Sequence, residues 1–146
     1  DDETVKLIIT DTFSMYGLKL DPLVLTRDIT DLEFLGFKIC KTDLGYIPRY
    51  PLGRLCCSFL KNDSVMDPWA EYSKMCSLMM MSAGNGEEVF EFFRRAVTTV
   101  VMSVDHPEFV KLRNTDLHNT IPKYSDVINW YLGVEGYSHV GEFYHG

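Results

Sequence analysis

Long apolar runs are missing from this sequence. No stretch approaches the roughly 20 consecutive apolar residues that a helix needs to cross a bilayer, so we predict no transmembrane segment. The first four residues are rich in acids, and this is the wrong charge for a signal or transit peptide. We therefore expect a chain without a targeting segment at its start.

Cysteine and histidine are scarce, with four residues of each. Two of the cysteines, Cys56 and Cys57, are adjacent, and no Cys-x-x-Cys pair is present. This pattern argues against a disulfide framework and predicts reduced cysteines, as in a cytosolic protein. The histidines stand at no metal-ligand spacing, so we predict no structural zinc site and assign no metal ligand in this chain.

Basic residues are outnumbered, with 14 Lys and Arg against 21 Asp and Glu and a net charge of −7. Such a balance argues against a chain that binds nucleic acid over its whole surface. The bases are nevertheless concentrated, because residues 31–61 carry five of them against three acids, while both flanking segments are acidic. The pattern indicates either a local nucleic-acid contact or a chance fluctuation.

The remaining composition is that of a folded protein, with 46% hydrophobic residues in a chain of 146. The first segment, residues 4–16, has apolar side chains at helical spacing, with Asp1 and Asp2 where an N-cap belongs and Gly17 as the stop. Residues 32–40 read as a strand, residues 41–45 as a turn and residues 46–48 as a returning strand. Pro48 predicts that the returning strand is short or lies at a sheet edge.

After Pro51 the apolar period becomes helical. Helices are predicted for residues 52–60, 69–81, 87 to about 104, 107–113 and 125–132, and an irregular tail for residues 133–146. The methionines at 79–81 and the pair Phe92 and Phe93 are expected in the core. The fold class is therefore α+β, a helix on a small antiparallel hairpin sheet (residues 1–50) followed by an all-helical part (residues 51–132).

Three stretches in this order carry a resemblance to a known family. They are YGLKLDP at residues 16–22, FLGF at residues 34–37, and YIP at residues 46–48 leading to RLCCSFLK at residues 54–61. This set resembles the C-terminal third of RNA-dependent RNA polymerases of positive-strand RNA viruses, most closely the astrovirus type. The resemblance covers residues 1 to about 80 and implies the end of a palm subdomain, with motifs D and E, followed by a helical thumb.

The resemblance implies an RNA-directed RNA polymerase, a nucleotidyltransferase that copies an RNA template. Its cofactor would be Mg²⁺ or Mn²⁺, with the metal ligands expected upstream of this chain, so this part would be inactive alone. Its partners would be RNA template and product, nucleoside triphosphates, and the remaining fingers and palm. Its location would be the host cytoplasm, in viral replication complexes.

The pair Asp1 and Asp2 could be the end of the family's metal-binding Gly-Asp-Asp motif. We favour an N-cap, because Glu3 leads directly into helical periodicity and leaves no room for the strand that follows that motif. Lys19 is the candidate for the motif D general acid that protonates pyrophosphate. Arg27 could supply the same charge, and a solvated surface lysine is the alternative interpretation of Lys19.

The resemblance assigns the primer grip of motif E, which lies against the 3′ end of the growing strand, to Phe34, Leu35, Gly36 and Phe37. The phosphate contacts along the template-product channel would be Lys38, Arg49 and Arg54, together with Lys41 and Lys61. The alternative is a hairpin whose aromatic residues belong to the core.

Two other functions stay open at this stage. A reverse transcriptase palm also contains a Gly-Leu-x-Leu-x-Pro turn and a Phe-Leu-Gly strand, which residues 17–22 and 34–36 satisfy. The chain could also be a small acidic interaction module without catalysis, and such a module should show no salt-dependent RNA binding.

Overall fold

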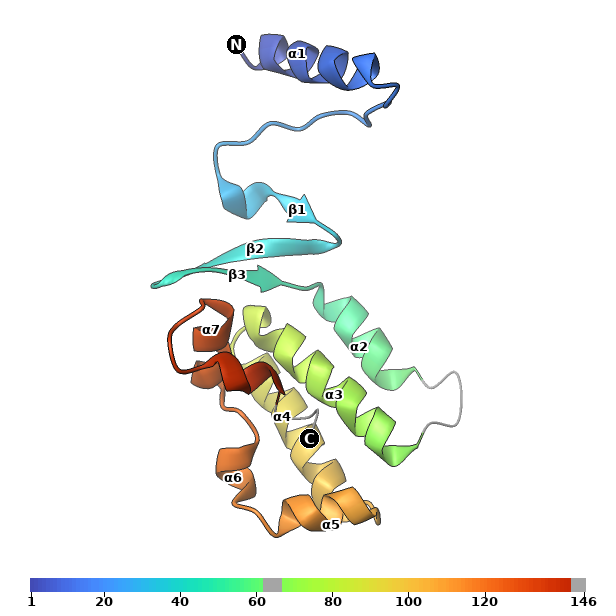
Figure 1. The fold of residues 1–146 in the computed structure, drawn as a ribbon, viewed down its shortest axis with the longest axis vertical. Coiled ribbons are helices and arrows are strands. Elements are labelled where there is room, and N and C mark those ends of the chain that lie inside the picture. The colour runs from blue at the N-terminus through green and yellow to red at the C-terminus, as the bar shows by residue number, and fades with distance from the viewer. Residues whose placement is uncertain (62–66, 143–146) are drawn as a thin grey trace. The chain divides into compact units, whose positions relative to one another are not determined.

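The computed structural model describes residues 1–61 and 67–142. The chain forms two compact units, Asp1–Leu32 and Glu33–Gly146, and Figure 1 shows the elements of each. The predicted change from strands to helices falls inside the second unit, because the hairpin strands before residue 51 belong to the same compact unit as the helices after it.

The first unit consists of helix α1, Asp2–Met15, an extended segment and the 3-10 turn η1, Ile29–Asp31. The predicted N-cap is confirmed, because the Asp1 carboxylate accepts a hydrogen bond from the Glu3 backbone N–H at 3.1 Å. The predicted stop is also confirmed, since Gly17 has a φ of +75° and the Leu18 N–H donates to the Phe13 carbonyl at 3.1 Å. No side chain of α1 is buried, although its sequence is amphipathic.

The second unit begins with a three-stranded antiparallel sheet in the order β1-β2-β3. Its strands are Glu33–Phe34, Phe37–Thr42 and Gly45–Arg49. The predicted single strand over residues 32–40 is wrong, because Leu35 and Gly36 form a two-residue turn with φ values of +51° and +82°. The turn brings Phe34 opposite Phe37, with ring centroids 5.9 Å apart. The predicted edge position of Pro48 is confirmed, since β3 ends the sheet.

The helical part confirms the α+β class. Its elements are α2 (Leu52–Leu60), α3 (Pro68–Ser82), η2 (Ala83–Asn85), α4 (Glu87–Ser103), α5 (Pro107–Arg113), α6 (Leu117–Thr120), α7 (Tyr124–Tyr131) and η3 (Ser138–Glu142). The short α6 was not predicted. The predicted irregular tail contains η3, whose Val140 is buried, while residues 143–146 lie outside the described residues.

The core lies among α3, α4, α5 and α7. Its largest fully buried side chains are Tyr72, Phe90, Phe93, Phe109 and Met79. The prediction holds for Met79 and Met80, but it is wrong for Phe92, which is 54% exposed. The buried stripe of α4 runs through residues 90, 93, 97 and 101, and Phe92 lies beside it against Phe59.

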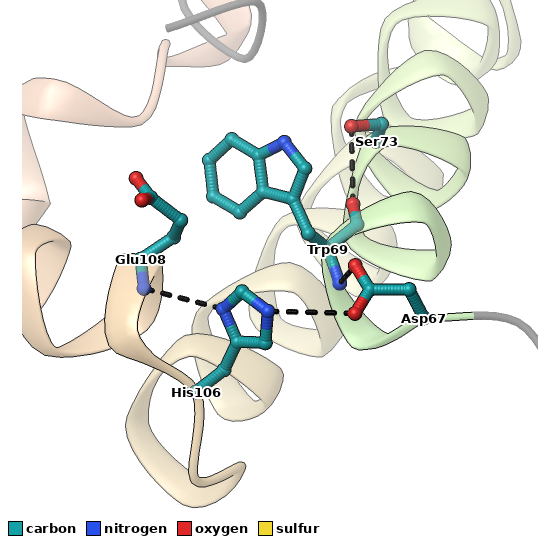
Figure 2. A network of polar contacts seen from close by, with 5 residues as sticks. All are labelled: Asp67, Trp69, Ser73, His106 and Glu108. Atoms are coloured by element: carbon teal, nitrogen blue, oxygen red, sulfur yellow. Dashed lines mark hydrogen bonds and ion pairs between the residues drawn. The ribbon is translucent and has the colours of Figure 1, made fainter.

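A polar network joins the starts of α3 and α5 (Figure 2). Asp67 caps α3 by accepting from the Trp69 N–H at 3.0 Å, and His106 caps α5 when its Nδ1 accepts from the Glu108 N–H at 3.2 Å. The His106 Nε2 lies 3.5 Å from an Asp67 carboxylate oxygen. The indole ring of Trp69 stacks on the imidazole ring, with an angle of 16° between the planes.

The sheet is attached to the helices at η2. A β-carbon on Gly84 would overlap the Pro48 carbonyl oxygen and lie 2.9 Å from the Arg49 Cα, so the two backbones are in direct contact. Next to this contact, the Asn85 side-chain amide donates to the Tyr50 carbonyl at 2.9 Å. These two contacts fix the end of β3, and therefore the start of α2, relative to the helical core.

Candidate nucleic-acid interface

Strand register places two of the predicted phosphate contacts side by side. Lys38 of β2 pairs directly with Arg49 of β3, and on its other side Lys38 pairs with Glu33 of β1. Residues directly opposite each other in antiparallel strands point to the same face of the sheet. The register therefore forms a row of three charged side chains on one face. Lys41 pairs with Tyr46 and lies on the opposite face, since side chains alternate along a strand.

Arg54 reaches the same region from the first turn of α2. A β-carbon on Gly36 would overlap the Arg54 guanidinium, so the side chain of Arg54 lies directly over the β1–β2 turn. The absence of a side chain at Gly36 makes this close approach possible, and its φ of +82° also favours glycine. We call Lys38, Arg49 and Arg54 the basic surface.

Two adjoining hollows lie beside the basic surface. The first, about 340 Å³, is lined by residues that include Glu33, Lys38, Arg49 and Tyr50. The second, about 250 Å³, is lined by residues that include Arg54. Gly36 and Tyr50 line both, so the four predicted residues Gly36, Lys38, Arg49 and Arg54 gather around one junction.

The charges of the basic surface are available to a ligand. Lys38, Arg49 and Arg54 are all exposed. None of them forms an ion pair or a side-chain hydrogen bond within residues 1–61 and 67–142. Exposed cations that form no ion pair are the usual means by which proteins contact the phosphates of nucleic acids.

The apolar residues of the predicted primer grip divide into two kinds. Phe34 and Leu35 are 62% and 81% exposed, which leaves them free to contact a ligand. Phe37 is half-buried, and its ring packs against Tyr50 with centroids 5.2 Å apart. Phe37 therefore fits the alternative interpretation, in which an aromatic residue of the hairpin packs against other side chains of the protein.

The remaining candidates do not belong to the basic surface. Lys19 is exposed in the unit formed by residues 1–32, outside the unit that carries the basic surface. Lys61 follows α2 and lines neither hollow. Two residues at the junction, Tyr50 and Asn85, were missed by sequence reasoning. Asn85 arrives from a distant part of the chain, and nothing local in the sequence marks it.

A catalytic metal site does not fit the residues present. Asp1 is engaged as the N-cap of α1, and no group of three or more His, Cys, Asp or Glu side chains able to hold a metal ion occurs in the described part of the chain. We therefore derive no catalytic step through Mg²⁺ or Mn²⁺ from these residues.

Comparison of the chain with models of known protein families, with curated proteins and with solved structures finds no match. Among the helices of residues 1–61 and 67–142, none combines the length and the apolar character that crossing a membrane requires.

Proposed function

We propose that this chain is the motif D, motif E and thumb part of a viral RNA-dependent RNA polymerase, and that its basic surface holds the phosphates of template and product RNA. The observation that carries the proposal is the convergence of Lys38, Arg49 and Arg54 around the Gly36 turn, where none of the three forms an ion pair among the described residues. The order of elements, a helix, a hairpin and then helices, also supports it.

The basic surface would position the RNA and would take no part in the chemical step. Arginine and lysine contacts to phosphate fix the register of a strand but read no sequence. The exposed side chains of Phe34 and Leu35 would pack on sugar or base at the 3′ end. In this proposal Lys19 is the general acid, while the metal ligands and the nucleoside triphosphate site belong to the remaining palm and fingers, so this chain alone is inactive.

The proposal also offers a role for the apolar face of α1. Val5, Ile8 and Phe13 are 43%, 59% and 40% exposed, although their spacing is that of an amphipathic helix whose apolar face packs against another element. The remaining palm of the polymerase would bury this face. The setting would be a replication complex in the host cytoplasm.

The test is the salt dependence of RNA binding by the 146-residue chain. We expect Lys38→Ala, Arg49→Ala and Arg54→Ala each to weaken binding and to reduce the slope of log K against log salt by about one unit, or about 0.7 on single strands. Base preference should stay the same, because phosphate contacts carry no sequence information.

Lys41→Ala is the matched control, since Lys41 lies on the same strand as Lys38 but on the opposite face. It should leave both affinity and slope unchanged. Three unchanged slopes in the basic-surface variants would refute the proposal and favour an interaction module without an RNA role.

A further inference from the structure

The first hollow has the size and polarity of a site for one nucleotide. Its volume of about 340 Å³ is at the lower end of the range of roughly 300–1,000 Å³ typical of small-molecule sites. Its lining combines the charged residues Glu33, Lys38 and Arg49 with apolar residues, among them Leu52 and Val89. A ligand that matches this lining carries an anionic group for the two cations and a flat part for the aromatic and apolar side chains.

We propose that this hollow binds one ribonucleotide 5′-phosphate, with the phosphate between Lys38 and Arg49 and the base against Tyr50. The inference rests on the proposed function, because it assigns single nucleotides rather than only backbone phosphates to the same surface. The aromatic ring of a tyrosine offers a stacking surface to any base, which makes the site tolerant of sequence.

Glu33 sets the orientation of the nucleotide. It ends the row Glu33–Lys38–Arg49, lines the hollow, and forms no ion pair within the described residues. A carboxylate repels phosphate, so the phosphate is confined to the Lys38–Arg49 end of the row. The same carboxylate accepts hydrogen bonds from hydroxyl groups, and ribose supplies one more of these than deoxyribose.

The position of Tyr50 is fixed by one contact from the hairpin and one from outside it. Asn85, which also lines the hollow, donates to the Tyr50 carbonyl at 2.9 Å, and the Tyr50 ring is held against Phe37. Because both the backbone and the ring of Tyr50 are held in place, this side of the hollow is preformed. A nucleotide would therefore bind without the entropic cost of ordering Tyr50.

The experiment measures binding of adenosine 5′-monophosphate (AMP) and of ribose 5-phosphate to the 146-residue chain by calorimetry or NMR titration. Both probes carry the same phosphate, and only AMP carries a base. We expect AMP to bind at least about fivefold more tightly, which is the lower end of measured base stacking on aromatic side chains. Equal affinities would overturn the proposal, and this comparison needs no variant that could misfold.

Variants then assign the phosphate contact and the base contact. Tyr50→Leu should lower AMP affinity to that of ribose 5-phosphate, and Lys38→Ala should weaken both probes about tenfold, as for a hydrogen bond to a charged group. Lys41→Ala should change neither. Glu33→Ala should remove any preference for AMP over 2′-deoxy-AMP, and a preference that persists would contradict the role given to Glu33.

A 5′-phosphorylated RNA tetramer distinguishes the source of the nucleotide. If it displaces AMP, the site takes one nucleotide of a bound strand; if it does not, the site takes a free nucleotide, and either result keeps the site. The two proposals fail separately. Equal binding of AMP and ribose 5-phosphate, with salt slopes that still fall in the basic-surface variants, refutes only the nucleotide site. A clear preference for AMP with unchanged RNA slopes refutes only the RNA role.

Discussion

Gly84 is the residue at which the sheet and the helical core come closest. A side chain there would meet the Pro48 carbonyl and the Arg49 Cα, which are backbone atoms and cannot rotate away. We expect Gly84→Ala to destabilise the protein by roughly 1–3 kcal/mol, as overpacking of a buried contact does. The urea midpoint measures this change, and RNA affinity should fall with it, because the same contact positions Arg49.

Gly53→Ala is the matched control at the residue scale. Gly53 is the second residue of α2, and apart from its chain neighbours and the backbone of its own helix no atom lies within 4 Å of where its β-carbon would be. Alanine is favoured over glycine by roughly 0.5–1 kcal/mol in a helix interior, so in the first turn this variant should be at least as stable as the parent. Equal changes in the urea midpoint for the two substitutions would contradict the claim that a side chain at Gly84 cannot be accommodated against the backbone of β3.

At the scale of elements, a polar network joins the starts of α3 and α5 (Figure 2). His106→Ala removes both the cap of α5 and the contact with Asp67, and we expect a loss of roughly 1–2 kcal/mol in the free energy of unfolding. His106→Asn restores a side chain that can cap the helix but not the contact with Asp67, so it should recover most of the loss. Urea denaturation of the two variants makes the measurement.

The exposed His118 of α6 serves as the control for this pair. Its side chain forms no hydrogen bond within the described residues, and its backbone carbonyl, which Arg94 contacts at 2.8 Å, is kept in His118→Ala. That variant should be within about 0.5 kcal/mol of the parent. If His106→Asn is no better than His106→Ala, capping is not what His106 contributes.

The elements that the sequence predicted well carry local signals at their ends. Asp67 before Pro68 starts α3, and Gly17 ends α1, because capping depends on one or two residues. The β1–β2 turn was missed because Leu35 takes a positive φ without the Asn-Gly or Asp-Gly pair that usually indicates such a turn. The four-residue α6 was missed for another reason, since its His118 carbonyl accepts a hydrogen bond from Arg94 of α4, which comes much earlier in the chain.

The candidate site shows the same division between local and distant information. The charges of Lys38, Arg49 and Arg54 could be selected from sequence, because they cluster within one short basic stretch. Which of the bases share a face depended on the strand register, which separates Lys38 from Lys41. Tyr50 and Asn85 become part of the site only through the contact of η2 with the end of β3, and that contact is tertiary.

The whole chain divides into two units that differ in how they are stabilised. Every fully buried hydrophobic side chain of the described residues lies at Ile47 or beyond, and none lies in residues 1–32. Burial of apolar surface is the main source of folding free energy. The second unit should therefore hold nearly all of the stability of the described chain.

Removal of residues 1–32 tests this division. Because no core side chain is lost, we expect the shortened chain, Glu33 onward, to keep the urea midpoint of the parent and the salt slope of RNA binding set by the basic surface. Val140→Ala in the full chain is the contrasting variant, since Val140 is 3% exposed and its truncation should cost roughly 2 kcal/mol. A shortened chain that loses more stability than this variant would mean that residues 1–32 support the core. A shortened chain that keeps its stability but loses the salt slope would place essential RNA contacts in the first unit, where Lys19 and Arg27 are the cations to substitute next.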